Sequence, residues 1–415
     1  MVHDELAEES RPADKLPRQV WLLGGVSFFA DVSSEMIYPL LPLFVVAVLG
    51  ASASEMGWIE GIAAAVVALL TAYAGARSDR FRRRLPWVRI GYGLPVLGKT
   101  ILAVAVAWPL VLVGRTVDRI GKGLRASPRD ALIADVTSEA MRGRAFGLHR
   151  AMDTAGALVG ALVAAVLLWW LSGSPGGQAA GAETDARPYR IIFAIAATMG
   201  VAAVALTFLV KEAAVPDSAS TPAAAPASSR GRLQLSRDYW LVIAMMMMFS
   251  IANSSDTFLL LRAVHVGLSP WLVVLAYAGY NVMYALGSYP AGALSDRIGR
   301  WRVIGVGWAL YALVYAGFAV SNATTIWPLF AVYGLYMALT DGVGKALVAD
   351  HARPDQRGRA LGVFYLATGV TTIGASVLAG VLWDRVDPSA PFWLGACAAA
   401  AAVVMLIAVR LGRKT

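Results

Sequence analysis

The chain has 415 residues, of which 58% are hydrophobic and only 15% are charged, and its formal net charge is +9. A soluble protein carries about a quarter charged residues, so this composition excludes an ordinary soluble domain and indicates an integral membrane protein. One cysteine and four scattered histidines exclude an internal disulfide and give no support to a transition-metal site.

Twelve candidate membrane spans follow from the distribution of apolar residues. A span needs about 20 predominantly apolar residues, and charges are absent from long blocks such as 40–54 and 303–339. We therefore predict an all-α membrane protein with twelve transmembrane helices. The predicted spans are residues 20–48, 56–76, 88–107, 109–136, 145–171, 189–210, 239–262, 271–294, 302–320, 326–350, 359–383 and 390–410.

Basic residues predict the orientation of these spans. With both termini in the cytoplasm, Lys and Arg concentrate at the cytoplasmic ends, and the outer ends carry only Arg187, Arg190, Arg262 and Arg385. This asymmetry is what the positive-inside rule requires. The topology explains the positive net charge, so we expect no nucleic-acid partner. Residues 1–19 form a polar cytoplasmic tail without a cleavable signal peptide, and we expect a multi-pass protein of the plasma membrane, in a bacterium the inner membrane.

The first span carries two carboxylates on one helix face. Asp31 and Glu35 are spaced i, i+4, and Tyr38 follows three residues later. Burial raises the pKa of a carboxyl group and nearby guanidinium groups lower it, so a carboxylate in such a site can load and release a proton near neutral pH. We predict Asp31 and Glu35 as proton-coupling residues, or alternatively as salt-bridge partners only, and Tyr38 as part of a substrate cavity.

The cytoplasmic end of the second span carries a glycine followed by charged residues, and two arginines flank a glycine before the fifth span. Glycine lets two helices approach closely, and an aspartate accepts hydrogen bonds from helix N-termini or arginines. Such a charged clasp can hold two helix bundles together in one state and release them in another; ordinary flanking charge is the alternative. The clasp residues of this half are Gly75, Asp79, Arg80, Arg83, Arg142 and Arg144.

The fourth and fifth spans contain charges that a lipid-facing helix would not tolerate. Four residues of the fourth span are spaced i, i+3, i+4, i+7 and share one face, so they must face a cavity or partners. An ion-pair network that only stabilises the fold is the alternative. The predicted cavity residues are Arg115, Asp118, Arg119, Lys122, His149 and Arg150, with Asp153 as a further proton-coupling candidate. The P-loop-like stretch 93–100 lies inside the third span, so we expect no nucleotide there.

The second half of the chain repeats the first. Ser33-Ser34-Glu35 returns as Ser254-Ser255-Asp256, and the clasp patterns return in the same order at nearly the same offset, about half the chain length. Twin halves in an apolar chain are typical of secondary transporters. The repeat adds Asp256 as a proton-coupling candidate. The clasp residues of the second half are Gly292, Asp296, Arg297, Arg300, Arg357 and Arg359.

The repeat also predicts the domain organisation. We expect two pseudo-symmetric six-helix bundles, at 20–211 and 239–410, with a short cytoplasmic tail at 411–415. Residues 212–238 read as a flexible cytoplasmic linker because most of that stretch is rich in Ala, Pro and Ser.

Polar aromatic residues of the second half complete the predicted substrate cavity. Residues Tyr280, Asn281 and Tyr284 share one face of the eighth span, and tyrosine hydroxyls on apolar rings suit an amphipathic organic ligand. Packing between helices is the alternative. Asp341 and Lys345 of the tenth span echo the charged stripe of the fourth span, and we include both in the cavity.

These motifs resemble those of the major facilitator superfamily. The second clasp copy matches that family's signature between spans 2 and 3, and the first departs at Arg82, where glycine is usual. The resemblance implies two six-helix bundles that rock around a central site, with a clasp at Asp79 and Asp296 favouring the outward-open state. The stretch that begins at Arg115 resembles the span-4 motif of drug–proton antiporters, whereas Ala161 stands where their fifth span has proline.

The sequence therefore predicts a secondary active transporter rather than an enzyme. We expect it to move a small organic solute by alternating access, coupled to protons and working in efflux or antiport. The alternative is an organic-anion importer or exchanger that uses the basic stripe of the fourth span. A receptor without transport is a third possibility. We expect no cofactor and no metal, the proton as coupling ion, a lipid bilayer as partner, and a functional monomer.

Overall fold

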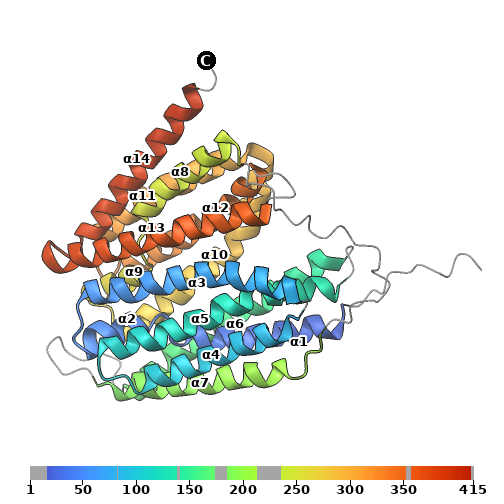
Figure 1. Cartoon of the computed structure of the whole chain (residues 1–415). Coiled ribbons are helices and arrows are strands. Elements are labelled where there is room, and N and C mark those ends of the chain that lie inside the picture. The colour runs from blue at the N-terminus through green and yellow to red at the C-terminus, as the bar shows by residue number, and fades with distance from the viewer. Residues whose placement is uncertain are drawn as a thin grey trace, which may run out of the picture.

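The computed structural model describes residues 16–81, 83–137, 141–172, 185–212, 235–351 and 357–412, and this part of the chain is helical without a strand (Figure 1). The helices are α1 (Arg18–Glu35), α2 (Leu41–Leu43), a π-helical turn (Phe44–Val48), α3 (Ala53–Phe81), α4 (Leu85–Ala103), α5 (Trp108–Asp135), α6 (Arg142–Leu171), α7 (Arg187–Thr207), α8 (Arg237–Ala252), α9 (Thr257–His265), α10 (Pro270–Ile298), α11 (Arg300–Ala319), α12 (Ile326–Asp350), α13 (Arg357–Arg385) and α14 (Ala390–Gly412).

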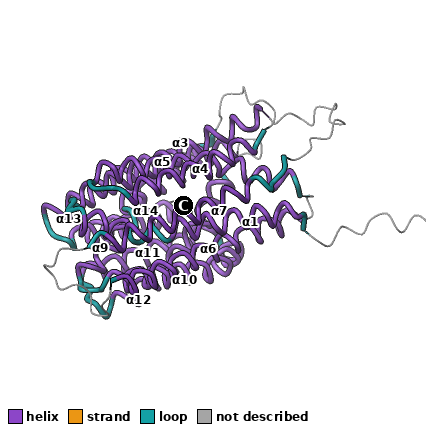
Figure 2. The backbone as a smooth tube through the Cα atoms, turned by 90° about the horizontal axis from the view of Figure 1, so that it is seen from below, coloured by secondary structure: helices purple, strands orange, loops and turns teal. Residues whose placement is uncertain are grey.

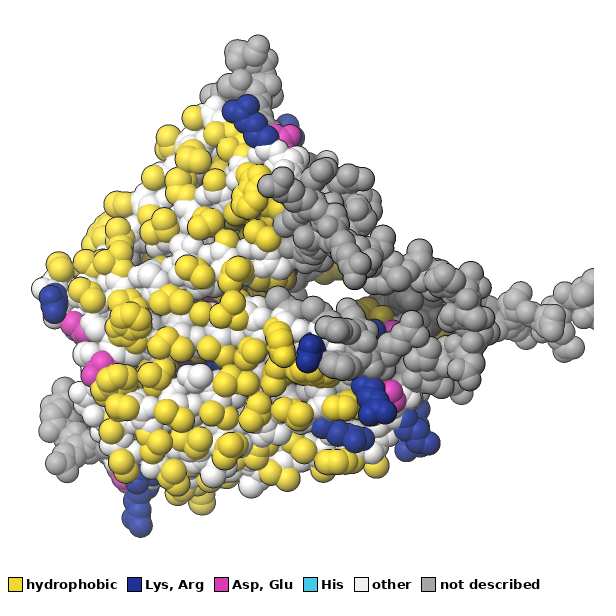
Figure 3. All heavy atoms as spheres, viewed as in Figure 1, with side chains coloured by type: hydrophobic (Ala, Val, Ile, Leu, Met, Phe, Trp, Pro, Cys, Tyr) yellow, Lys and Arg dark blue, Asp and Glu magenta, His cyan; other side chains and the backbone are white. Residues whose placement is uncertain are grey.

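Eight segments of the described residues are long and apolar enough to cross a membrane. They overlap eight of the predicted spans, from 53–75 to 390–409. The other four predicted spans, which fall on α1 with α2, α4, α5 and α10, are not among these segments. The count of twelve therefore stays a prediction, whereas the all-helical membrane fold is confirmed. Figure 3 agrees, because hydrophobic side chains cover most of the visible face and Lys and Arg gather near its ends.

The helices pack in two groups that correspond to the two halves of the sequence. In the first group α4 packs against α5 and α7, and α1 against α6 and α7. In the second group α10 packs against α12, and α11 against α12 and α14. The groups meet along α3 with α13 and α6 with α10, and the short helix α2 also contacts α9. Figure 1 shows the second group above the first, and Figure 2 shows the same helices from below.

Two of the predicted spans are interrupted near matching positions of the repeat. The first span ends its regular helix at Glu35, because Pro39 lacks the N–H that would bond the Glu35 carbonyl. The seventh predicted span is broken completely between α8 and α9, over residues 253–256. Asn, Ser and Asp compete with the helix for backbone hydrogen bonds, which accounts for this break. We predicted both spans as continuous, and the structure corrects this.

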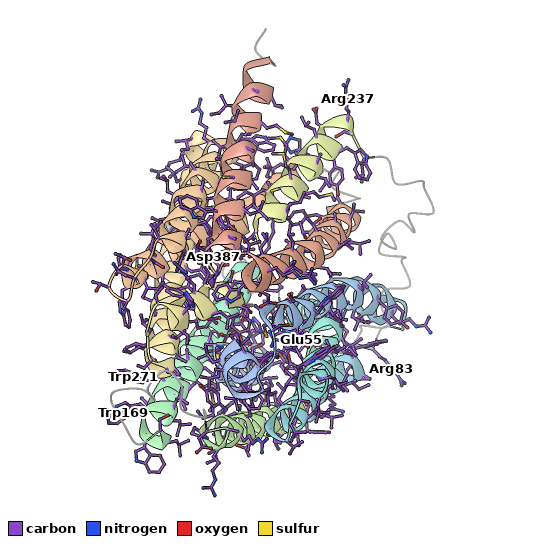
Figure 4. All side chains as sticks on the ribbon, turned by 90° about the vertical axis from the view of Figure 1, so that its left-hand side faces the viewer. Glu55, Arg83, Trp169, Arg237, Trp271 and Asp387 are labelled. Carbon is purple, nitrogen blue, oxygen red and sulfur yellow. The ribbon has the colours of Figure 1, made fainter. Side chains whose placement is uncertain are left out.

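The two groups touch at one end of α3 and diverge at the other. A Cβ on Gly57 would lie 2.4 Å from the carbonyl oxygen of Ser376, so only glycine allows α3 and α13 to approach this closely. At the same end the Asp384 carboxylate accepts hydrogen bonds from the backbone N–H groups of Ala53 (3.0 Å) and Ser54 (2.8 Å). Figure 4 looks onto this closed end, where Glu55 and Asp387 mark the two groups.

Candidate functional site

A cavity of about 690 Å³ lies between the two groups and extends toward the end of α3 that carries the predicted clasp. It is walled by α3 and α5 on one side and by α13 on the other. A smaller cavity of about 230 Å³ enters the second group and shares Tyr365, Thr368 and Thr372 with the first. The two cavities therefore form one cleft, closed at the Asp384 end. The polar and charged residues of the larger cavity are Tyr38, Glu60, Thr71, Arg115, Arg119, Lys122, Ser127, Asp130, Tyr365, Thr368 and Thr372.

Arg115 is neutralised by a carboxylate that the sequence analysis missed. Its Nε donates to Glu60 Oε1 at 2.9 Å and its Nη2 to Oε2 at 3.1 Å, a two-point contact that fixes both side chains. The guanidinium also lies over the Tyr38 ring, 5.4 Å from its centroid. Glu60 is the one acidic residue of the otherwise apolar predicted span 56–76, and its isolation there was the available signal.

The remaining charges of α5 are unevenly compensated. Asp118 is buried behind the cavity wall, with its carboxylate 3.4 Å from Arg119 Nε and 4.0 Å from Lys99 Nζ. Lys99 also donates to Ser33 Oγ at 2.6 Å. Lys122 is exposed to the cavity and has no ion-pair partner among the described residues. The wall formed by α5 therefore presents a surplus of positive charge.

Glu35 connects the two groups of helices. The Tyr277 hydroxyl of α10 donates to Glu35 Oε2 of α1 at 2.9 Å. The rings of Tyr38 and Tyr277 lie beside this bond, with centroids 5.5 Å apart. The contact crosses from the first half of the repeat to the second, so the charge on Glu35 bears directly on how the halves are held.

Asp31 of α1 and Asp153 of α6 come from two helices that pack against each other. Arg150 contacts Asp153 at 3.4 Å. His149 is buried and its Nε2 lies 2.7 Å from Ser27 Oγ, so the structure places it in an internal network rather than on the cavity wall.

The second half holds its carboxylates differently. Asp256 lies in the break between α8 and α9 and accepts a hydrogen bond from the Tyr333 hydroxyl at 2.7 Å. No cation pairs with Asp256 in the described part of the chain. Asp341, in contrast, pairs with Lys345 Nζ at 2.8 Å and accepts from the Tyr284 hydroxyl at 2.7 Å.

The predicted aromatic face of α10 is largely occupied by neighbouring rings. Tyr280 is buried and lies near Tyr284 and Tyr333, with ring centroids 6.3 and 5.5 Å away. Asn281 donates through Nδ2 to the Tyr277 carbonyl at 3.0 Å. Neither Tyr280 nor Asn281 lines the two cavities described above, whereas Asp341 and Lys345 line the smaller one.

The clasp is partly described. Side chains of Asp79, Arg80, Arg142, Arg357 and Arg359 lie outside the described residues. The Arg300 guanidinium contacts Asp296 at 3.1 Å and also Asp350 of α12. These contacts join α10, α11 and α12 within the second half, so in this conformation they do not bridge the halves. Asp350 was not predicted.

The other clasp positions vary in their packing. Gly75 lies against α5, where a Cβ would come within 2.6 Å of Ser127 Oγ, whereas Gly292 has open space around it. The side chains of Arg83, Arg144 and Arg297 are exposed.

A helical membrane protein with a charged cleft between two repeated halves has the architecture of a membrane transporter. The family model of the Major Facilitator Superfamily matches residues 23–279 and 261–415. The chain belongs to this superfamily and is a transporter, not an enzyme.

Relatives and solved structures agree with this assignment. An uncharacterized MFS-type transporter, MJ1317, of Methanocaldococcus jannaschii is 33% identical over 95% of this chain and 95% of its own length. The multidrug resistance protein MdtH of Photorhabdus laumondii is 32% identical over 32% of this chain and 33% of its own length. The nucleoside transporter NupG shares the fold with a TM-score of 0.74 at 13% identity, covering 94% of this chain and 99% of NupG.

Proposed function

We propose that the protein is a proton-coupled secondary transporter that exports a small organic solute by alternating access. Its two bundles, residues 20–211 and 239–410, rock around the cleft. The observation that carries the proposal is the hydrogen bond from Tyr277 to Glu35, because it ties an ionisable side chain to the junction between the halves. We further propose that it works as a monomer in the plasma membrane, the inner membrane of a bacterium, with both termini in the cytoplasm.

Protonation of Glu35 would weaken this junction. A hydrogen bond to an ionised carboxylate is roughly twice as strong as a neutral one, so a proton on Glu35 favours separation of the halves at the closed end. The structure, closed at the Asp384 end and hollow toward the clasp end, then represents the inward-facing state. Asp31 with Asp153, and Asp256, supply further carboxyl groups that can hold a proton.

Export is favoured by the partial similarity to MdtH, which is named as a multidrug resistance protein. A proton antiporter needs a site that alternates between proton and substrate. Glu35 lies next to Tyr38 of the cavity wall, so proton and substrate binding can compete through this pair of neighbours.

The second candidate is import or exchange of an organic anion. The specific observation in its favour is the surplus positive charge of α5, where Lys122 faces the cavity without an ion-pair partner among the described residues. An uncompensated cation in the membrane is costly, and a carboxylate or phosphate group of a substrate would offset that cost.

Proton flux in proteoliposomes tests the proposal. An internal pH dye reports proton movement while cationic, neutral and anionic compounds are added to wild type, Glu35→Gln and Asp256→Asn. Asp185→Asn, which removes an exposed carboxylate far from the cleft, is the matched control. We expect substrate-evoked proton movement in wild type and in the control, and its loss in Glu35→Gln.

Solute flux without proton movement in wild type would contradict proton coupling. The charge of the active compounds separates the two candidates. Cationic or neutral drugs support the exporter, whereas anions that compete with one another in a salt-sensitive way support the anion carrier.

A further inference from the structure

A groove on the surface of the second half lies beside the connection between α10 and α11. It has a volume of about 880 Å³ and is bounded by the end of α10, the first turns of α11 and the last turns of α14. None of its residues lines the central cleft, so it is a separate site. Its lining includes Asp296, Arg297, Trp301, Arg302, Val306 and Ile407.

The groove runs from the membrane surface toward the hydrocarbon region. Its helices α11 and α14 belong to the candidate spans 300–319 and 390–409, so Arg302 lies at the end of a span and Val306 one turn deeper. The Val306 and Ile407 side chains are 59% and 53% exposed. Trp301 lies between the basic and apolar parts, at the depth where tryptophan is favoured.

The rim of the groove carries positive charge that the protein itself does not balance. Asp296 is paired with Arg300 at 3.1 Å, and Arg300 also contacts Asp350. Arg297 and Arg302 are exposed and have no ion pair among the described residues. An anion at the membrane surface would compensate both arginines.

We propose that this groove binds an anionic phospholipid. The phosphate group contacts Arg297 and Arg302, and an acyl chain lies along Val306 and Ile407. The basic rim lies at the membrane surface and the apolar wall lies directly beneath it. A ligand that fills both parts therefore needs a negative head group and a long apolar tail in one molecule.

Two polar segments of the chain fit the groove less well. The stretch 213–234 contains one acidic residue, Asp217, and two arginines, so its net charge is positive. The stretch 1–15 is acidic but has no apolar run that would cover the wall. A bilayer lipid provides both parts and already surrounds α11 and α14.

Native mass spectrometry of the full chain, released from detergent with defined lipids, tests the proposal. The probes are palmitoyl-oleoyl phosphatidylglycerol and palmitoyl-oleoyl phosphatidylcholine, which share their acyl chains and differ in net charge. We expect wild type to retain the phosphatidylglycerol at least about tenfold better, an energy difference near 1.4 kcal/mol. The double variant Arg297→Gln/Arg302→Gln should lose most of this preference.

Three further variants keep the result interpretable. Arg297→Lys/Arg302→Lys retains the charge and should retain most of the preference. Arg187→Gln removes an exposed arginine at the start of α7 and should leave the preference unchanged. Val306→Trp, which fills the wall, should reduce binding of both lipids.

The proposal is overturned if the double glutamine variant, folded as judged by gel filtration and helical circular dichroism, keeps the wild-type preference. Displacement of the lipid by soluble glycerol phosphate would show that the site reads a free anion rather than a lipid. Displacement by a synthetic peptide of residues 1–15 would show that the acidic tail is the occupant.

Discussion

The buried pair of Arg115 and Glu60 shows how the cleft tolerates charge inside a membrane. Each side chain is expensive to bury alone, and their two-point contact offsets that cost. The contact also orients Arg115 over Tyr38, so it shapes the cavity wall as well as balancing its charge.

Removing one member of this pair should therefore destabilise the protein more than removing both. We expect Glu60→Gln to lower the free energy of unfolding in detergent by about 3 kcal/mol, because Arg115 is left buried and unpaired. The double variant Glu60→Gln/Arg115→Gln should recover part of that loss. Chemical unfolding followed by tryptophan fluorescence measures three variants, which are Glu60→Gln, Arg115→Gln and the double variant. Additive losses in the double variant would show that the two residues act independently.

Lys122 offers a direct test of the substrate's charge. If the substrate is an anion, Lys122→Gln should reduce its transport about tenfold or more, since a charged hydrogen bond contributes about 1.5–3 kcal/mol, and Lys122→Arg should preserve most of it. If the substrate is a cation, Lys122→Gln should leave transport unchanged or raise it. Uptake of labelled compounds into proteoliposomes distinguishes the two results.

At the residue scale, the sequence predicted which charged side chains share a face, but not which side chains they pair with. The spacing of Arg115, Arg119 and Lys122 predicted one face, and the structure places all three on the cavity wall. Their unequal pairing could not be foreseen, because Glu60 comes from another helix and Asp118 turns away from the cavity. Likewise, the repeat could not predict that Glu35 bonds across the halves while Asp256 bonds within its own half.

Among the helices, the contact between α3 and α13 controls the closed end. The Asp384 carboxylate caps the N-terminus of α3 from the other half of the molecule, where the helix dipole also favours negative charge. Because the cap comes from the other half of the molecule, separation of the halves at this end would break it.

Asp384→Ala should open that end more often. Loss of a helix cap costs about 1 kcal/mol, so we expect roughly a fivefold increase in the rate at which a cysteine at Ile373, opposite Gly61, reacts with a membrane-impermeant maleimide. The background needs Cys397→Ala, since Cys397 is exposed. Asp387→Ala is the matched control, because Asp387 accepts from Ser389 rather than from α3. Equal labelling rates in both variants would contradict the gating role of Asp384.

The elements themselves were largely predictable. Hydrophobic length located the helices to within a few residues, as for predicted span 145–171 and the α6 apolar segment 144–171. The break between α8 and α9 was missed because its four residues are outnumbered by the apolar residues of the predicted span 239–262. The signal was the run Asn253-Ser254-Ser255-Asp256, whose side chains favour helix ends.

For the whole molecule, the repeat predicted twin halves, and the described helices pack in two groups that correspond to them. Which end is closed could not be predicted, because a protein with two conformations that differ by only a few kcal/mol encodes both in one sequence. The structure supplies that information through the Gly57 approach and the Asp384 cap.

The distance between the halves as a function of pH tests proton-coupled alternating access most directly. Spin labels on cysteines at Arg83 and Arg237, both exposed and in separate halves (Figure 4), report the open end in the Cys397→Ala background. On lowering the pH from about 8 to about 5, a range in which carboxyl groups and histidine titrate, we expect the shorter-distance population to grow in wild type. The shift should vanish in Glu35→Gln, whose side chain cannot titrate, and Asp185→Asn should behave as wild type. Distance distributions that are identical at both pH values in wild type, or a shift that persists in Glu35→Gln, would contradict a role for Glu35 as the proton switch.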